Sequence, residues 1–371
     1  MKVLEINTSS FQRLGITIHL LNYYRHIDST TIQADFIANR NVDNELVNLF
    51  ESLGFHVFSL SSRDHKPVQY CIDLIKLIRR NKYDIVRVHG SSSLMAIEML
   101  AAFLGGCKIR ITHSHNTKTE HNTIHMLLKP FLYMFTNVYY SCGQDAGRFL
   151  YGKRKFTVIP NAIDISEYRF DENVRNQIRQ SFSINDKIVV GHVGNINSQK
   201  NHQFLIKIMA ELMKKSNKFV LICVGAGDCS ELEEEAVHLG IADRIQFLGQ
   251  HKDVPALLNA FDIMCLPSLY EGFPLVTVEW QAAGLEALLS DSVTKEVCIT
   301  DLVHYRNLED GAAKWAEDIL AYSKRKIDRK YYNVLVSQSD YSIIKAASEL
   351  VDGFEELARN GVKANANDGR A

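Results

Sequence analysis

Short apolar runs rich in β-branched residues alternate with segments of helical periodicity along almost the whole chain. The strands expected in the first half are Val3–Ile6, Gln33–Ala38, His56–Leu60, Ile85–His89, Lys108–Thr112, Asn137–Ser141 and Thr157–Ile159. Helical segments separate them, and Tyr70–Arg80 is the clearest because its apolar residues recur at three- and four-residue spacing. This alternation is typical of βαβ units and predicts a parallel sheet with helices on both faces.

A second series of strands and helices follows in the second half. Its expected strands are Lys187–Val193, Phe219–Val224, Arg244–Leu248, Asp262–Leu266 and Glu286–Ser290. Two such series predict an α/β protein with two Rossmann-like, doubly wound parallel-sheet domains, and 371 residues are enough for about two domains. We expect one domain over 1–163, a second over 164–340, a last helix over 341–358 and a disordered polar tail over 359–371.

The bulk composition excludes several classes of protein. It is 46% hydrophobic and 23% charged, as in an ordinary folded protein, and a formal net charge of −1 gives no electrostatic basis for binding nucleic acid. The seven cysteines are scattered without a CxxC pair, which favours buried thiols in a reducing compartment. The longest apolar stretch, Leu94–Gly106, is shorter than the ~20 residues of a membrane-spanning helix. We therefore expect a cytoplasmic protein that is soluble or attached to a membrane surface.

The segment Pro267–Glu279 carries the most specific chemical signal. It predicts a loop with Glu271, followed by a helix that begins at Pro274 and carries Glu279. Proline suits the first position of a helix, and Gly272 allows a tight turn before it. The N–H groups of the first helical turn could then bind a phosphate or another anion. The bare spacing also fits a surface loop that runs into an amphipathic helix.

The first strand of the second series ends in the polar loop Gly191–His202, which carries Gly194, Asn195 and Lys200. A glycine after a strand and a lysine before a helix resemble a phosphate-binding loop, although the spacing of a P-loop is absent. The competing interpretation of Lys200 is a solvated lysine at the start of a helix.

Histidines follow two strand ends in the first half. His89 closes one predicted strand, and His113 and His115 follow the next. A neutral imidazole at such a position can hydrogen-bond a ligand or polarise a hydroxyl group. Two interpretations compete, a structural histidine pair and the HxH of a metal-dependent amidohydrolase. No later strand end supplies the His and Asp set that the amidohydrolase would need.

Together these segments resemble glycosyltransferase family 4, retaining enzymes of the two-domain GT-B fold. Pro267–Glu279 looks like the donor-sugar motif of that family, Gly191–His202 like its second conserved loop, and His115-Asn116 like the step that carries its active-site histidine. The resemblance is nearest to bacterial enzymes of exopolysaccharide, capsule or lipopolysaccharide assembly. It implies an N-terminal acceptor domain and a C-terminal donor domain that face each other across a cleft, with the last helix crossing back to the N-terminal domain.

The resemblance also implies a reaction, the transfer of a hexose from a nucleotide diphosphate sugar, commonly UDP-linked, to a hydroxyl of a lipid-linked or growing bacterial polysaccharide. Retention at the anomeric carbon, no metal and no other cofactor are expected. The catalytic candidates are His115, Glu271 and Lys200. The donor-binding candidates are Gly15, Gly194, Asn195, Lys200, Ser268, Glu271, Gly272, Phe273, Pro274, Leu275 and Glu279. His89 and His113 are candidates on the acceptor side. Basic residues at Arg148 and 153–155 suggest peripheral contact with the cytoplasmic face of the inner membrane.

Two positions depart from the family pattern. Asn195 stands where the family has an arginine for the diphosphate, and near Gly15 the residues Leu14 and Thr17 replace the rest of a Gly-Gly-acidic pattern. A catalytically inactive scaffold subunit therefore stays open as an alternative, as does a nucleotide-sugar epimerase or hydrolase of the same fold.

Overall fold

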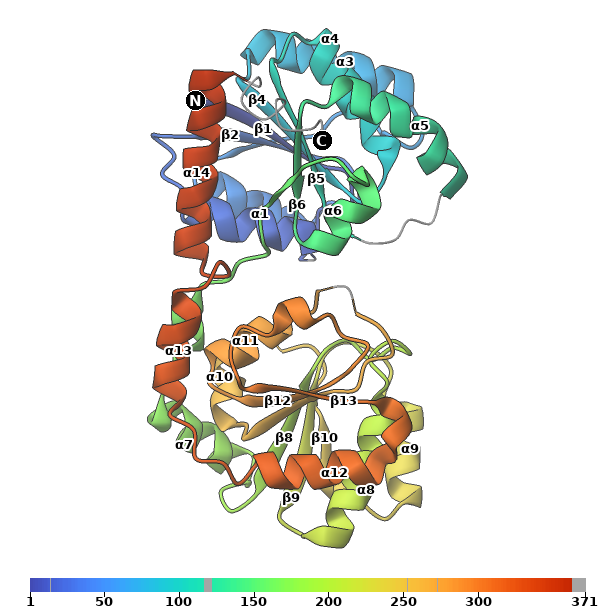
Figure 1. Cartoon of the computed structure of the whole chain (residues 1–371), viewed down its shortest axis with the longest axis vertical. Coiled ribbons are helices and arrows are strands. Elements are labelled where there is room, and N and C mark those ends of the chain that lie inside the picture. Colours follow the sequence, from blue (N-terminus) through green and yellow to red (C-terminus); the bar gives the residue numbers. More distant parts are fainter. Residues whose placement is uncertain (14, 117–121, 252, 272, 362–371) are drawn as a thin grey trace. The chain divides into compact units, whose positions relative to one another are not determined.

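The computed structural model describes residues 1–13, 15–116, 122–251, 253–271 and 273–361, and the chain divides into two compact units (Figure 1). Unit 1 comprises Met1–Ala162 together with the chain from Ile343 onward, and unit 2 comprises Ile163–Ser342. The chain thus leaves unit 1 next to the boundary expected at 163 and returns two residues after the boundary expected at 340. Each unit is an α/β structure with one parallel sheet, as the alternating pattern predicts.

The sheet of unit 1 has seven parallel strands in the order β3-β2-β1-β4-β5-β6-β7. These strands are β1 Lys2–Asn7, β2 Gln33–Ala38, β3 His56–Phe58, β4 Ile85–Gly90, β5 Ile109–Ser114, β6 Val138–Ser141 and β7 Thr157–Val158. The helices are α1 Gly15–Arg25, α2 Asn44–Ser52, α3 Pro67–Asn81, α4 Ala96–Leu104, α5 Asn122–Phe135, α6 Gln144–Tyr151 and α14 Ile343–Asn360. The strand order reverses between β1 and β4, which makes their carboxyl ends the switch point of this sheet.

Helices cover both faces of this sheet. Helices α1, α2 and α14 pack on one face, with Leu20, Phe50 and Phe354 in a common core. Helices α3 to α6 cover the other face, where Leu74 and Met99 are buried. Figure 1 shows α14 beside the sheet of unit 1, so the last helix belongs to the first unit although it is the most distant in sequence. Because both faces are covered, the strands are apolar in nearly continuous runs.

Unit 2 repeats the same topology with six parallel strands in the order β10-β9-β8-β11-β12-β13. The strands are β8 Ile188–Val193, β9 Phe219–Val224, β10 Ile245–Phe247, β11 Ile263–Leu266, β12 Glu286–Ser290 and β13 Val303–Arg306. The helices are α7 Glu172–Ser181, α8 His202–Lys215, α9 Ser230–His238, α10 Val254–Ala260, α11 Val276–Ala282, α12 Gly311–Tyr322 and α13 Arg329–Ser337. Here the strand order reverses between β8 and β11, which places the switch point of unit 2 at their carboxyl ends.

The structure corrects two details of the sequence-based expectations. Helix α11 begins at Val276, so Pro274 is not its first residue. The Pro274 carbonyl instead accepts hydrogen bonds from the backbone N–H and the hydroxyl of Thr277, which closes a turn before the helix. Strand β13 was not predicted, because this short edge strand carries polar residues such as His304.

Residues 362–371, most of the expected disordered tail over 359–371, lie outside the described residues. Among the helices that the structure does describe, none combines the length and the apolar character that crossing a bilayer requires.

Candidate functional site

In unit 2 the loops that follow β8 and β11 are bound to each other at the switch point. The backbone N–H of Leu269 donates to the carbonyl of Gln199 at 2.8 Å. The side-chain amide of Asn201 donates to the carbonyl of Pro267 at 3.1 Å. Since β8 and β11 are neighbouring parallel strands, both loops leave the same edge of the sheet, and these bonds fix their side chains relative to one another.

These loops assemble what we call the Lys200–Glu271 cluster, made of Gln199, Lys200, Ser268 and Glu271. The Lys200 Nζ lies 2.6 Å from the Glu271 Oε1, which also accepts a hydrogen bond from the Ser268 hydroxyl at 2.7 Å. The Gln199 amide donates to the other carboxylate oxygen at 3.0 Å. The two charged side chains are only 14% and 7% exposed, so this charge pair is well shielded from water. Three members were expected from the sequence, whereas Gln199 was overlooked although it is adjacent to Lys200.

A glycine-rich loop after β9 packs tightly against the β8 loop. A Cβ atom on Gly225 would lie 2.0 Å from the carbonyl oxygen of Gly194, and one on Gly227 would lie 2.6 Å from the Cβ of Ile196. Asn195 also joins these two loops, because its side-chain oxygen accepts a hydrogen bond from the backbone N–H of Ala226 at 3.2 Å. The residue that replaces the family's arginine therefore binds backbone within the protein.

The residues after Glu271 pack against neighbouring parts of unit 2. The ring of Phe273 stacks on Tyr341, with centroids 5.1 Å apart. The N–H groups of Thr277 and Val278 donate to the carbonyls of Pro274 and Leu275, so they are engaged within the chain and do not await an anion. The anion-binding role expected for the N–H groups near residues 272–275 stays a prediction. Gly272 lies outside the described residues.

Glu279 lies in the first turn of α11, and its carboxyl accepts a hydrogen bond from the Tyr168 hydroxyl. Burial raises the pKa of the Glu279 carboxyl to about 7, an effect that the hydrogen bond from Tyr168 partly offsets and that nearby Glu167 strengthens. The carboxyl therefore changes protonation state near neutral pH. Tyr168 was not anticipated, because its proximity to α11 follows from tertiary packing.

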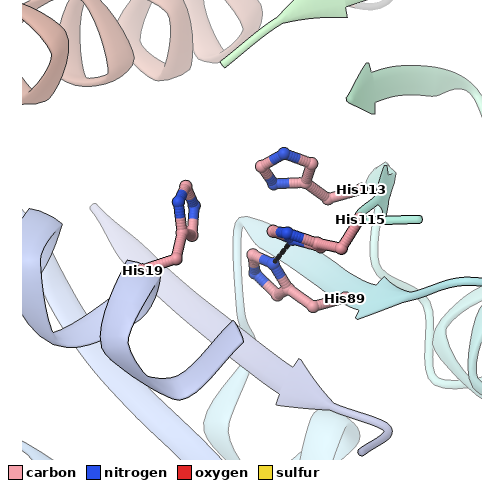
Figure 2. Close-up of side chains that lie close together, drawn as sticks. All are labelled: His19, His89, His113 and His115. Carbon is pink, nitrogen blue, oxygen red and sulfur yellow. Dashed lines mark hydrogen bonds between the residues drawn. The ribbon is translucent and has the colours of Figure 1, made fainter. Parts of the chain in front are cut away.

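In unit 1 four histidines converge at the switch point, and we call them the histidine cluster. His89 is the next-to-last residue of β4, His113 lies in β5, His115 follows β5, and His19 lies in α1. One nitrogen of each ring can be chosen so that all four lie within 4.8 Å of one another. Figure 2 shows the four rings turned toward a common region. Three of them were predicted from the sequence, and His19 was missed. The order of the elements was the available signal for His19. The helix α1, which carries His19, is the next element after β1, and β1 lies beside β4.

A buried ion pair supports one side of the histidine cluster. The Nε2 of His89 lies 2.7 Å from the Glu5 carboxylate. The Nδ1 of the same ring lies 2.9 Å from the Nε2 of His115. The same carboxylate pairs with the Arg87 guanidinium at 2.9 Å and accepts a hydrogen bond from the Tyr24 hydroxyl. The Arg87 and His89 partners hold the pKa of Glu5 down at about 2 despite its burial. Glu5 is therefore a fixed negative charge that orients His89.

The four imidazoles are neutral at physiological pH. Burial lowers the pKa of His89 to about 4, and burial with mutual repulsion holds the pKa of His19 and His113 well below the usual value. The pKa of His115 is lowered in the same way, and this residue alone of the four is half-buried. A Cβ atom added to Gly15, the first residue of α1, would meet no atom within 4 Å, so the backbone there borders open space.

The two clusters offer different chemistry. The Lys200–Glu271 cluster presents an ammonium and a carboxylate at one point, which suits a ligand that carries an anionic group next to hydroxyl groups. The histidine cluster presents neutral nitrogens that can hydrogen-bond hydroxyl groups or coordinate a metal ion.

Comparison with known proteins gives consistent matches. Residues 174–333 match the family model described as "Glycosyl transferases group 1". Over 366 residues, which cover 93% of this chain and 94% of the relative, the chain is 32% identical to EpsF of Bacillus subtilis (strain 168), whose name describes a glycosyltransferase. It is also 24% identical over 326 residues to the "UDP-Gal:alpha-D-GlcNAc-diphosphoundecaprenol alpha-1,3-galactosyltransferase" of Escherichia coli, covering 80% of this chain and 81% of that protein.

A solved structure of similar fold is that of Anabaena Alr3699/HepE in complex with UDP. It superposes with a TM-score of 0.81 at 17% identity and covers 96% of this chain and 100% of that chain. At this identity the likeness establishes a shared fold.

Proposed function

Because the chain belongs to the glycosyl transferases of group 1, we propose that it moves a hexose from a UDP-linked sugar to a hydroxyl of a lipid-linked or growing polysaccharide, with retention at the anomeric carbon. The names of the relatives support the choice of substrates. The relative from Escherichia coli is named for a UDP-Gal donor and a diphosphoundecaprenol-linked acceptor, and the HepE structure contains UDP.

The observation that carries the proposal is the 2.6 Å contact between Lys200 and Glu271 at the switch point of unit 2. A nucleotide sugar brings a diphosphate and sugar hydroxyl groups close together, so it offers each of the two side chains a partner of matching character. Lys200 would bind the diphosphate and neutralise the charge that develops as it leaves, and Glu271 would accept hydrogen bonds from the sugar. A lysine in this role supplies the positive charge that a divalent metal supplies in other glycosyltransferases.

Three further residues complete the assignment. Glu279 would accept a hydrogen bond from a ribose hydroxyl. His115, half-buried and neutral, would hydrogen-bond the transferred sugar or the acceptor hydroxyl. Asn195, already bonded to Ala226, leaves Lys200 as the proposed cationic group for the diphosphate. One charge-assisted hydrogen bond contributes about 1.5–3 kcal/mol, so donor affinity should be lower than with an arginine at position 195.

Two measurements on the unmodified chain test the proposal. Calorimetric titration with UDP, GDP, ADP and CMP should give binding of UDP. Consumption of the UDP-sugar should then require a lipid-linked or oligosaccharide acceptor. Rapid donor turnover without an acceptor would identify an epimerase or hydrolase instead. No affinity for any nucleotide or nucleotide sugar would identify a scaffold subunit, the alternative that Asn195 favours.

Unit 1 carries an exposed apolar surface that we assign to the membrane bearing the acceptor. Met126, Leu127, Phe131 and Met134 of α5 are each at least half exposed, while Leu132 on the same helix is buried. The neighbouring segment 153–155 is basic, and its Arg154 guanidinium stacks on Tyr133 of α5, 4.1 Å from the ring centroid. An apolar helix face beside basic residues favours binding at an anionic membrane surface.

This assignment is tested with vesicles of phosphatidylglycerol and phosphatidylcholine. Leu127→Glu should reduce co-sedimentation, because it places a charge on the inserted face. The matched control is Val237→Glu on α9 of unit 2, since Val237 and Leu127 are both 67% exposed. Equal binding by the two variants would remove α5 from the membrane contact.

A further inference from the structure

The histidine cluster has buried ring nitrogens that the protein leaves unused. Both nitrogens of His113 have no hydrogen-bond partner within the described part of the chain, and His19 has only the side chain of Asn161 beside it as a hydrogen-bonding group. A buried polar group without a partner costs roughly 1–3 kcal/mol. An unpartnered His113 ring packed against the rings of His19 and His115 indicates that the cluster can take a partner other than the protein.

The geometry of the cluster limits what that partner can be. The ring centroids of His113 and His115 are 4.2 Å apart, and His19 lies 5.1 Å from each of them. The ligand nitrogens, all within 4.8 Å of one another, leave room for an atom but not for a sugar ring among them. Four imidazole nitrogens around a zinc ion at 2.0–2.1 Å would be about 3.3 Å apart. The observed nitrogen separations, from 2.9 Å between His89 and His115 to at most 4.8 Å, bracket that spacing.

The surroundings also match those of a metal-binding histidine. The Nε2 of His89 contacts the Glu5 carboxylate, which leaves Nδ1 facing the other rings. A carboxylate behind a histidine is the usual outer contact that fixes the ring of a metal ligand. The positive charge of Arg87 is compensated by Glu5 at 2.9 Å, so the pair adds no net charge beside the rings.

We propose that His19, His89, His113 and His115 bind one divalent transition-metal ion of the zinc class. Neutral imidazoles suit zinc, copper or nickel, whereas magnesium and calcium prefer oxygen ligands. Four protein ligands fill a tetrahedral shell, which is typical of a structural or regulatory ion and leaves no position open for catalysis. The proposed ion is therefore distinct from a metal at the diphosphate.

The site has a consequence for activity that rests on the proposed function. His115 is both a ligand of the ion and the group assigned to the sugar or acceptor. We place both roles on the Nε2 of His115, which faces His89 at 2.9 Å, and one nitrogen cannot coordinate a metal and hydrogen-bond a hydroxyl at the same time. Bound zinc should therefore inhibit transfer, and removal of zinc should restore it.

The metal site is tested by measuring the metal directly, and the effect on transfer is measured separately with the zinc-loaded and the stripped chain. The full chain is stripped with a chelator and titrated with zinc chloride by calorimetry, and with cobalt(II) by visible absorption. We expect one tight equivalent of zinc and the intense visible bands of tetrahedral cobalt. His19→Ala and His113→Ala should each weaken zinc binding at least 10-fold. The control His65→Ala removes an exposed histidine of unit 1 and should change nothing.

Each outcome decides one point. Absence of the cobalt bands in the unmodified chain, or equal zinc binding by all three variants, overturns the metal site, whatever the enzyme does. Tight binding of zinc without inhibition of transfer upholds the metal site and overturns the assignment of the His115 Nε2 to the sugar or acceptor. The two proposals can therefore fail separately.

Discussion

The two units share one topology but carry opposite chemistry at equivalent places. In unit 1 the strand order reverses between β1 and β4, and in unit 2 between β8 and β11. At the first switch point lie four neutral histidines. At the second lie a lysine and a glutamate in contact at 2.6 Å. The same backbone arrangement thus presents uncharged nitrogens in one unit and a charge pair in the other.

The difference shows that topology selects the place of a site, whereas side chains and burial select its ligand. Carboxyl ends of parallel strands at a switch point leave room for a ligand in both units. The charge pair of unit 2 suits a diphosphate, because a shielded ammonium binds an anion strongly. The imidazoles of unit 1 are kept neutral by burial, and they suit hydroxyl groups or a metal ion.

The largest effect that would test this comparison concerns the charges of unit 2. Lys200→Met and Glu271→Gln each remove one charge at similar volume, and each should lower the rate of transfer about 100- to 1000-fold. Lys200→Met removes the charge proposed to stabilise the leaving diphosphate, and Glu271→Gln removes the carboxylate proposed to hold the sugar hydroxyls. The rate is measured with saturating UDP-sugar. The control Lys214→Met removes a lysine that is 68% exposed on the far end of α8, and it should leave the rate unchanged. Near-normal turnover of both charge variants would place the chemistry elsewhere.

A smaller, pH-dependent effect is expected from Glu279. Its pKa is about 7 in the folded chain, against 4.5 for a glutamate in water, so the folded state binds more protons between these values. The contribution of Glu279 to stability is therefore most favourable below pH 4.5 and is lost as the pH rises to about 7. Glu279→Gln should raise the melting temperature by a few degrees at about pH 8 and leave it nearly unchanged at about pH 4.5.

The same variant should bind UDP more weakly at about pH 8, because an amide replaces the carboxylate proposed for the ribose. A higher melting temperature together with a lower UDP affinity would show that Glu279 contributes to binding although its buried carboxylate lowers the stability of the fold. If calorimetry shows an unchanged UDP affinity, Glu279 does not bind the ribose, and its role is limited to the contact with Tyr168.

The smallest effect is expected at Asn195. Asn195→Arg should tighten UDP binding about 10-fold, which corresponds to about 1.4 kcal/mol, because it adds a charged donor beside Lys200. The change also removes the 3.2 Å bond to Ala226, which limits the gain. Calorimetry with UDP checks the result. Weaker binding would mean that the contact between the two loops matters more than the additional charge.

Much of the fold could be predicted from the sequence. The strands Gln33–Ala38, Phe219–Val224 and Glu286–Ser290 were expected with the bounds that the structure gives, because strands buried on both faces are continuous apolar runs. The GT-B fold and membership of the glycosyltransferases, inferred from the Pro267–Glu279 and Gly191–His202 segments, are confirmed by the comparisons. The polar edge strand β13 escaped prediction because one exposed side removes the apolar signal.

The site was less predictable than the fold. Lys200 and Glu271 were named from separate segments, but their direct contact depends on β8 and β11 being neighbours. His19 gave no signal of its own, since a single histidine on an amphipathic helix is commonly a structural residue. The roles of the donor-binding residues stay predictions until a nucleotide sugar is tested.

The sequence by itself determined which segments become strands and helices, because periodicity and propensity act over neighbouring residues. Only the tertiary structure decided which strand ends lie side by side, and therefore that His19 joins His89, His113 and His115. It also decided the charge of each group. A buried imidazole is neutral and Glu279 titrates near pH 7 because removal from water and neighbouring charges set a pKa, and both depend on the folded surroundings.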